Sequence, residues 1–492
     1  MPKTPRSKSV RLRGFVKEFG ETIFSTDDDI LLCRICEKSV NSEKRYFVTQ
    51  HCDSIAHKRN VAKTHGTKST KTASQTLSEC LVDKDSDFTQ DLCNALIASD
   101  IPLHKIENHS FRAFLEKYTK KSIPSRTSLR KYVDRIYQQT LTKIRETVSD
   151  KNIWISIDET TDSMGRYVAN TIIGTLEPGG KSNIFLLNSE WLEKTNASTI
   201  SQAITNALCI LWPEGIQHDR VILLVTDAAA YMRKASTALQ ILFPNMIYLT
   251  CTVHGLHRVA EEIRAIFDRV DRLISNGKKV FLKAPSRVQA FKEKFPEIPL
   301  PPAPVVTRWG TWVNAALYYS NYLESFRDVI EDFSEDDAAS IRATKKCLED
   351  VDLRNDLAFI SAHCSTLPNT ITKLEEANLS MASSFELLDQ EIARLNSMPG
   401  QKGSKIKAKV NLVFGRNKGL ETLQQISRIL EGESVVDLKI SPDLVASYKY
   451  APLTSVAVER SFSRLRNILT DNRLSFSFEN LCKHLIIVCN FK

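Results

Sequence analysis

The sequence predicts a mixed α/β protein of about three domains with a small zinc-binding module. Strand and helix patterns alternate over residues 151–265, and the segments on either side have the three- and four-residue apolar spacing of helices. A Cys/His pattern typical of zinc ligands lies near the N-terminus. The chain has 492 residues, of which 42% are apolar, so it is long enough to form more than one core.

Charge and cysteine usage narrow the class of protein. The net charge is +9, and basic residues are concentrated in the first 75 positions, as in the segment 57–74. We interpret this charge as nucleic-acid contact or a nuclear import signal, with a solvated linker as the alternative. No apolar run is long enough for a membrane span, and the basic N-terminal segment has no signal-peptide core, so we expect a nuclear protein without a membrane partner. The 11 cysteines follow no disulfide spacing, which indicates free thiols and a metal site.

Residues 1–65 are expected to form a finger of the BED or C₂H₂ type. A C-x₂-C pair is followed by two histidines at about the spacing of such fingers. The expected zinc ligands are Cys33, Cys36, His51 and His57. Cys52 and His65 are alternative ligands, and the expected small core consists of Tyr46, Phe47 and Ile55. Because so small a domain buries little apolar surface, the zinc ion would supply its stability.

Residues 66–86 are rich in Ser, Thr and Lys and are expected to be a basic linker. Residues 87–150 are expected to be a helical DNA-binding or dimerisation segment, in which Pro124 and Ser125 mark the entry of a long helix. We expect three basic residues at the start of this helix to contact DNA: Arg126, Arg130 and Lys131. A solvated helix face is the alternative.

Residues 151–265 are expected to form the first part of a ribonuclease H-like core. Their order is three strands, helix, strand, helix, strand and helix, which is the element order of that fold. Its first and fourth strands are neighbours at the sheet centre, so Asp158 and Asp227 are expected to meet. Buried acids are rare without partners or metal ions, which favours a metal site. Either aspartate could instead cap a helix.

Residues 266–440 are expected to be a helical insertion, broken by the Pro-rich FPEIPLPPAPVV and by MPGQKGSKIKAK. Residues 441–492 are expected to complete the core with a helix from about Ser455, a turn at Asp471–Asn472 and a last apolar helix. Glu459 lies in the first of these helices. A fold can bring such a distant acid to the two aspartates, but in isolation Glu459 would pair with Arg460 or Arg464.

Together the three acids suit two-metal chemistry on a phosphodiester. Carboxylates are hard oxygen ligands that Mg²⁺ and Mn²⁺ accept, and two such ions about 4 Å apart stabilise the attacking and leaving oxygens of an in-line displacement.

Several motifs together resemble the hAT superfamily of cut-and-paste DNA transposases and the host proteins derived from them. They are the finger, IPSRTSLRKYV, the DETTD strand, LVTDAAAYMRKA, CTVHGLH, TRWGTW and SVAVERSFSRLRNILTDNRLSFSFENL. The last of these looks like the hAT C-terminal dimerisation region. The N-terminal third is also similar to the CGG-repeat-binding protein.

The resemblance implies roles for individual residues. It implies that Asp158, Asp227 and Glu459 are a DDE triad. It also matches Cys251 and His254 to the family's C-x₂-H motif and Trp309 to its RW motif. His254 would contact the scissile phosphate, with a core histidine as the alternative. Arg308 would neutralise a phosphate, and Trp309 would stack on an extruded base, although core packing is commoner for tryptophan and Trp312 competes for this role.

The implied function is a zinc- and Mg²⁺- or Mn²⁺-dependent DNA transposase. The implied reaction is strand cleavage by activated water, followed by attack of the liberated 3′ hydroxyl on another phosphodiester. The expected partners are double-stranded DNA, as transposon ends or promoter-type sites, and a second copy of the chain in a homodimer or higher oligomer. The alternative is a domesticated, catalytically inactive nuclear transcriptional regulator. A dimeric interaction protein without DNA affinity is a third possibility.

Overall fold

The structure is a computed structural model that describes residues 8–36, 38–55, 57–58, 61, 75–305, 310–435, 438, 440–469 and 476–491. The chain divides into two compact units, Met1–Asp87 and Phe88–Lys492. Helices and strands are both present, so the mixed α/β class is confirmed. No helix in the described ranges is long and apolar enough to cross a bilayer.

The first unit is a short helix followed by a three-stranded antiparallel sheet and a second helix. Its elements are α1 (Lys8–Phe19), β1 (Phe24–Thr26), β2 (Leu31–Cys33), β3 (Lys38–Val40) and α2 (Arg45–Asp53). Its core consists of Leu12, Phe15, Phe24, Leu31, Cys33 and Val48. The predicted core residues Tyr46 and Ile55 are 65% and 87% exposed, and Phe47 is half-buried. That prediction was wrong because α1, which we had not predicted, supplies Leu12 and Phe15.

Helices precede the sheet of the second unit. They are α4 (Gln75–Ala98), η1 (Leu103–Glu107), α5 (His109–Thr119) and α6 (Arg126–Val148). Ser125 caps α6 as its sequence position indicated, because its side chain accepts a hydrogen bond from the Ser128 backbone N–H at 3.2 Å. Helix α4 begins inside the predicted linker 66–86, so the end of that segment is helical, whereas residues 62–74 lie outside the described residues.

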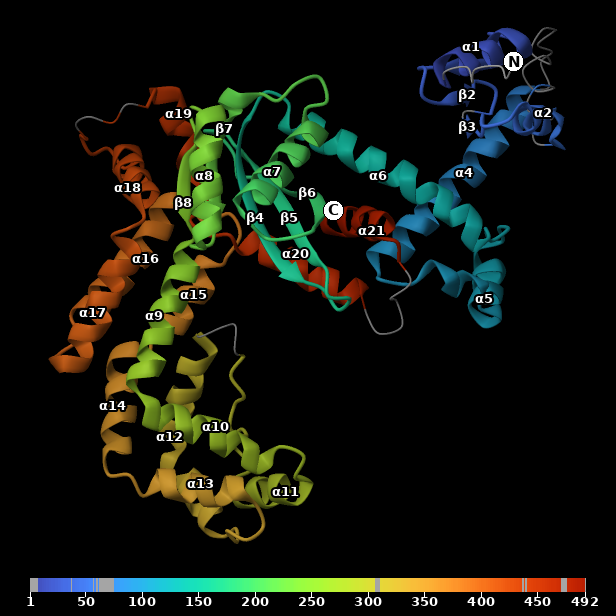
Figure 1. The fold of residues 1–492 in the computed structure, drawn as a ribbon. Helices are drawn as coiled ribbons and strands as arrows, with labels where there is room; N and C mark the ends of the chain where they lie inside the picture. Colours follow the sequence, from blue (N-terminus) through green and yellow to red (C-terminus); the bar gives the residue numbers. More distant parts are fainter. Residues whose placement is uncertain are drawn as a thin grey trace, which may run out of the picture. The chain divides into compact units, whose positions relative to one another are not determined.

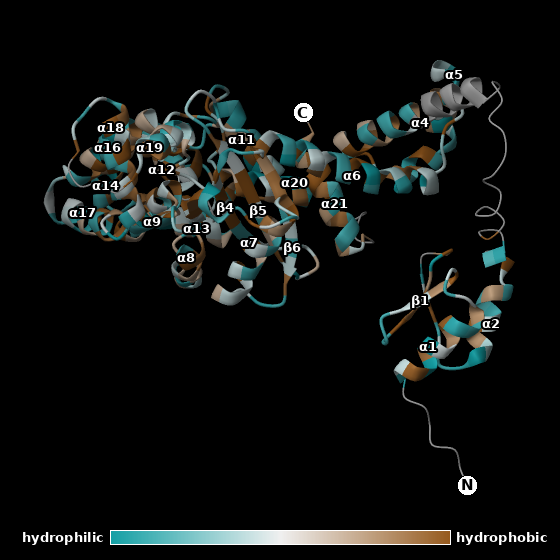
Figure 2. Cartoon of the chain, turned by 90° about the horizontal axis from the view of Figure 1, so that it is seen from above, coloured by the Kyte–Doolittle hydropathy of each residue, from teal (hydrophilic) through white to brown (hydrophobic). Residues whose placement is uncertain are grey.

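A five-stranded mixed sheet forms the centre of the second unit (Figure 1). Its strands are β4 (Asn152–Thr161), β5 (Tyr167–Leu176), β6 (Ile184–Leu192), β7 (Val221–Thr226) and β8 (Ile247–Thr250), in the spatial order β6-β5-β4-β7-β8. β4 pairs with β5 antiparallel and with β7 parallel. All residues of β7 are buried, as expected for a strand covered on both faces. Figure 2 shows that β4 and β5 are largely hydrophobic.

Helices cover both faces of this sheet. On one face, α7 (Ala197–Leu211) and α8 (Ala230–Leu242) pack against alternate β4 residues such as Ile155. On the other face, α9 (Thr252–Ile266), α20 (Val456–Ile468) and α21 (Phe478–Asn490) belong to the core that contains Trp154. The 3₁₀ turn η2 (His218–Arg220) leads into β7. Segments from the middle and the end of the chain therefore complete one core.

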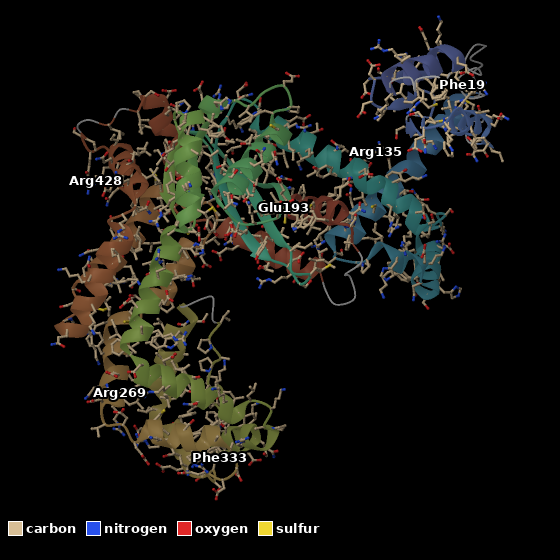
Figure 3. All side chains as sticks on the ribbon, viewed as in Figure 1. Phe19, Arg135, Glu193, Arg269, Phe333 and Arg428 are labelled. Atoms are coloured by element: carbon tan, nitrogen blue, oxygen red, sulfur yellow. The ribbon has the colours of Figure 1, made fainter. Side chains whose placement is uncertain are left out.

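A helical region lies between α9 and α20. Its helices are α10 (Asp268–Phe281), α11 (Pro285–Lys294), α12 (Gly310–Glu331), α13 (Ala339–Leu348), α14 (Asp352–Cys364), α15 (Leu367–Leu374), α16 (Met381–Asn396), α17 (Gly400–Phe414), α18 (Lys418–Leu430), α19 (Pro442–Ser447) and η3 (Tyr448–Tyr450). Arg269 of α10, labelled in Figure 3, joins helices in this region through ion pairs with Asp350 and Asp356, at 3.0 and 3.5 Å.

One sequence expectation for the helical region is changed. MPGQKGSKIKAK was predicted to break the helices, and its first residues, Met398 and Pro399, do separate α16 from α17, but α17 starts at Gly400 and runs through the rest of the segment. The glycine content misled the prediction: Gly403 is a buried helical residue, and a Cβ there would lie 2.1 Å from the Met398 carbonyl oxygen. The helix predicted from about Ser455 is α20, whereas the predicted turn at Asp471–Asn472 lies outside the described residues.

Candidate functional sites

The predicted zinc ligands of the first unit lie together. Cys33 ends β2, Cys36 follows in the turn before β3, His51 is in α2, and His57 follows a break at Ser54. The ligand atoms of all four side chains lie within 4.8 Å of one another. The His57 Nδ1 atom is 3.6 Å from Cys33 Sγ and 3.3 Å from Cys36 Sγ. This group could bind one tetrahedrally coordinated zinc ion.

The chemistry of this group also fits zinc. Burial lowers the pKa of both His51 and His57, which favours the neutral imidazole that binds metal. The buried Nε2 atom of His51 has no hydrogen-bond partner among the described residues, and a zinc ion would give it one. Cys52 is not a member of the group, and His65 lies outside the described residues.

In the second unit, Asp158 and Asp227 lie at the same end of adjacent parallel strands. Ser156 of β4 pairs with Val225 of β7, and each aspartate lies two residues beyond that pair. Since side chains alternate along a strand, Asp158 projects to the face of Trp154 and Asp227 to the face of Val225. Trp154 and Val225 belong to the same core, so the two carboxylates share the sheet face covered by α9 and α20.

His254 and Glu459 are supplied by these two helices. Their side chains form an ion pair, in which His254 Nε2 lies 3.4 Å from Glu459 Oε1. The His254 side chain is 30% exposed and that of Glu459 is 27% exposed. Glu459 therefore does not follow its sequence alternative, since Arg460 donates a hydrogen bond to the backbone carbonyl of Glu375 instead. The other ring nitrogen of His254, Nδ1, lies 3.3 Å from Ser455 Oγ.

Hydrogen bonds between distant segments position these two side chains. The backbone N–H of Ser455 donates to Cys251 Sγ at 3.2 Å, and the Thr252 side chain donates to the Leu453 carbonyl at 3.0 Å. They attach the segment that enters α20 to the first turn of α9. Further along α20, Asn170 Nδ2 donates to Ser461 Oγ at 2.7 Å, and Asn170 is the β5 partner of Asp158. These contacts bring Glu459 to the sheet face of the two aspartates.

The electrostatics of this site indicate a place for cations. Burial raises the pKa of Asp158 to about 7; Glu159 and Asp227 add to the rise, while His254 opposes it. Burial lowers the pKa of His254, but Cys251, Glu459 and Asp158 together raise it to about 10. A protonated His254 therefore balances part of the carboxylate charge.

The donors of the site fit Mg²⁺ or Mn²⁺. Asp158, Asp227 and Glu459 offer hard carboxylate oxygens, which are the ligands that these ions prefer. The three acids do not form a group close enough to share a single ion; among the described residues only the Cys/His group does. In a two-metal site the acids are divided between two ions, so all three need not lie close enough to bind the same ion.

Sequence reasoning missed Glu159 and Tyr231. The Tyr231 hydroxyl of α8 donates to Glu159 Oε1, on the sheet face opposite Asp158. Burial raises the pKa of Glu159, and Asp227 adds to the rise. The DETTD motif contains Glu159, but nothing in the sequence ties it to a tyrosine of a later helix. Asp162 of the same motif stabilises a turn, since its carboxylate accepts from Arg166 Nε at 2.8 Å.

The other residues that we predicted to contact DNA lie in different surroundings. Arg126, Arg130 and Lys131 all line one cavity of about 650 Å³ formed with residues of α4, α20 and α21. Trp312 is 2% exposed and donates its indole N–H to Asp271 Oδ1 at 2.9 Å, so it is a core residue and does not stack on a base. Arg308 and Trp309 lie outside the described residues.

Residues 121–280 match a family model described as a domain of unknown function, DUF659. This match suggests a transposase-related family, and its range contains Asp158, Asp227 and His254. Residues 6–63 match the CGGBP1 N-terminal domain, which suggests DNA binding and spans the whole Cys/His group. A search of curated proteins finds no match to the chain.

Proposed function

We propose that the protein is a DNA-binding transposase of the hAT type that cuts and joins DNA strands with Asp158, Asp227 and Glu459. The observation that carries this proposal is the convergence of two strand ends and α20 on one face of the sheet. The strand order β6-β5-β4-β7-β8, with a parallel central pair, supports a ribonuclease H-like core. The match to DUF659 supports a transposase-related origin.

Each side chain has a role in this proposal. Asp158, Asp227 and Glu459 would hold two Mg²⁺ or Mn²⁺ ions, which supply charge stabilisation at the reacting phosphodiester. His254, positively charged and paired with Glu459, would bind a non-bridging phosphate oxygen and orient the scissile bond. Glu159 would stay on the far face of β4 and fix Tyr231. The buried sheet excludes bulk water from one side of the site.

The first unit would select the DNA. Its Cys/His group with bound zinc would hold a fold similar to the CGGBP1 N-terminal domain, and we propose that this fold recognises double-stranded DNA in the nucleus. Arg126, Arg130 and Lys131 would contact phosphates of the same DNA. The C-terminal helices α20 and α21 would dimerise the chain so that two DNA ends are paired.

A domesticated nuclear regulator without catalysis is the second candidate function. The match of residues 6–63 to the CGGBP1 N-terminal domain favours it, because that match concerns DNA binding alone. Both candidates predict a zinc-dependent DNA binder. They differ in whether Mg²⁺ or Mn²⁺ produces strand cutting.

Strand cutting is therefore the test. Supercoiled plasmid and candidate end oligonucleotides are incubated with the full chain and Mn²⁺, and nicking and joining are compared among wild type, Asp158→Asn and Glu459→Gln. The matched control is Glu214→Gln, since Glu214 is exposed and lies in the turn before β7, whereas Asp227 follows the other end of that strand. Activity that is lost in the first two variants and kept in the control supports the transposase. Tight DNA binding without metal-dependent cutting by wild type on its own end sequences supports the regulator.

A further inference from the structure

Two adjoining cavities lie next to Asp227, at the β8 edge of the sheet. The smaller, of about 110 Å³, is lined by Ala228, which follows Asp227, and by Cys251 at the start of α9. The larger, of about 410 Å³, is lined by residues of α8, β8 and the start of α18, which lie beside one another in Figure 1. The cavities share Arg233, Thr250, Arg416 and Asn417. They therefore form one continuous surface that starts beside the candidate active site.

This surface carries positive charge without compensation. Five basic side chains line it. Four of them form no ion pair with a described residue: Arg233, Arg258, Arg416 and Lys418. Lys409 pairs with Glu262 at 3.2 Å. Neither cavity is lined by an aspartate or a glutamate. Four like charges gathered without a carboxylate repel one another, and a bound polyanion would remove that repulsion.

The fold holds these cations in place. Asn417 is buried and pairs with the edge strand at both amide atoms: its Nδ2 donates to the Thr250 carbonyl at 2.7 Å, and its Oδ1 accepts from the Thr250 N–H at 3.2 Å. A Cβ at Gly419 would lie 1.9 Å from the Tyr248 carbonyl oxygen, so α18 approaches β8 as closely as its backbone allows. Arg416 and Lys418 flank Asn417, so their backbone is held at the edge of the sheet, and Arg416 lines the same two cavities as Arg233 of α8.

We propose that Arg233, Arg258, Arg416 and Lys418 form a phosphate-binding track for the DNA strand that enters or leaves the candidate active site. Guanidinium groups donate paired hydrogen bonds that match phosphate geometry. Cations spread over α8, α9, the turn before α18 and its first residue suit a polymer with repeated phosphates better than one small phosphate ligand. This inference rests on the proposed function only where it identifies the bound DNA as the substrate. Binding of DNA by the track does not require that the protein cuts it.

The test measures DNA binding without turnover. Wild type and the Arg233→Gln/Arg416→Gln double variant, both as zinc-loaded full chains, are titrated onto a labelled duplex with a single-stranded extension, without Mg²⁺ or Mn²⁺, over a series of salt concentrations. Both arginines are exposed, so the fold should persist, and an unchanged thermal transition checks this. We expect affinity to fall on the order of tenfold and the slope of log K against log salt to become shallower by about 1.8 for two lost contacts.

Two further variants make the test specific. Lys279→Gln/Lys346→Gln removes two exposed charges from α10 and α13 and should leave the slope unchanged. Arg233→Lys/Arg416→Lys keeps the charge and should restore most of the slope. An unchanged slope in the glutamine variant, or an equal loss in the α10/α13 control, overturns the track. If the salt slope becomes shallower in the glutamine variant but wild type never cuts DNA, the track is supported and the transposase is overturned. If wild type cuts DNA but the slope is unchanged in the glutamine variant, the transposase is supported and the track is overturned.

Discussion

At the scale of single residues, Asp158 is the most informative side chain. It is partly buried on β4, and its neighbours Glu159 and Asp227 are also acidic. Burial is the largest cause of the rise of its pKa to about 7, so its charged form is disfavoured when no cation is bound. The same property would couple the protonation of Asp158 to a bound metal ion, since a cation would reverse the penalty.

This raised pKa predicts a pH dependence of stability in the metal-free protein. A carboxyl whose folded pKa lies above its unfolded value, near 4, contributes stability that is fully present below that value and is lost as pH rises through about 7. Between pH 5 and pH 8 we expect Asp158 to cost the second unit about 2–3 kcal/mol of unfolding free energy, since part of the roughly 4 kcal/mol of the whole shift is already lost below pH 5. Urea unfolding at a series of pH values, with zinc present and Mg²⁺ absent, measures this loss.

Asp158→Asn and added Mn²⁺ provide the controls for that experiment. The variant has no carboxyl to ionise, so the pH-dependent loss should be smaller than in wild type, and the remainder belongs to other groups such as His254, whose raised pKa also costs stability as pH rises above about 6.5. Mn²⁺ should reduce the loss in wild type by stabilising the carboxylate. An equal loss of stability in wild type and Asp158→Asn would show that Asp158 titrates normally.

Residues differ in how far the sequence predicts their environment. The positions of Asp158 and Asp227 follow from two apolar runs that are each followed by an acid, because parallel neighbouring strands bring the residues after these runs to the same level of the sheet. The interaction of Glu159 with Tyr231 could not be predicted, since it depends on how α8 packs across the opposite face. The same limit applies to Tyr46 and Ile55, whose exposure depends on where α1 packs.

At the scale of elements, the Cys/His group, which could bind zinc, predicts that the fold of the first unit depends on that ion. Cys33→Ser removes one of four ligands, and we expect zinc content to fall and the fold of the first unit to be lost, because the metal supplies much of the folding free energy of so small a core. Cys52→Ser is the matched control, since Cys52 is outside the group. Metal analysis and site-selective DNA binding measure the effect. Full zinc occupancy in Cys33→Ser would argue for a different ligand set.

The contact of α18 with β8 predicts a strong effect of a single methyl group. In Gly419→Ala the new Cβ would meet the Tyr248 carbonyl oxygen at 1.9 Å, and because that atom belongs to the backbone, α18 must move. We expect a loss of about 1–3 kcal/mol of unfolding free energy, typical of overpacking. Gly179→Ala is the control, because a Cβ there meets nothing within 4 Å. Equal stability of both variants in chemical unfolding would contradict this close packing.

The helical region shows why element boundaries are hard to predict. Glycine and serine favour loops in general, yet Gly403 lies inside α17, where the neighbouring Met398 carbonyl leaves no room for a side chain. Ser125, by contrast, was predictable as a helix cap because capping depends on residues only three positions apart. Local signals are readable from sequence, whereas signals set by tertiary packing are not.

At the scale of the whole molecule, the order of strands along the chain predicts the sheet, but it does not predict which contacts connect distant segments. Asn170 with Ser461 and Cys251 with Ser455 join residues roughly 200 to 300 positions apart, with sequence separations of 291 and 204. The spacing of apolar residues in the sequence does not predict contacts between such distant residues. The resemblance to a known family, not the spacing of residues, pointed to Glu459 as the third acid.

The division into two units predicts two separate unfolding transitions. The first unit has a small core and a Cys/His group, whereas the second has two large cores around the sheet and none of the predicted zinc ligands. Removing zinc from the full chain with a chelator should therefore abolish the transition of the first unit and leave that of the second within about 2 °C, because a ligand stabilises only the unit that binds it. Differential scanning calorimetry with and without chelator, with Cys33→Ser as a chelator-free equivalent, measures both. A single transition that shifts as a whole on chelation would mean that the two units unfold together, and the finger would then stabilise the candidate catalytic core as well as select DNA.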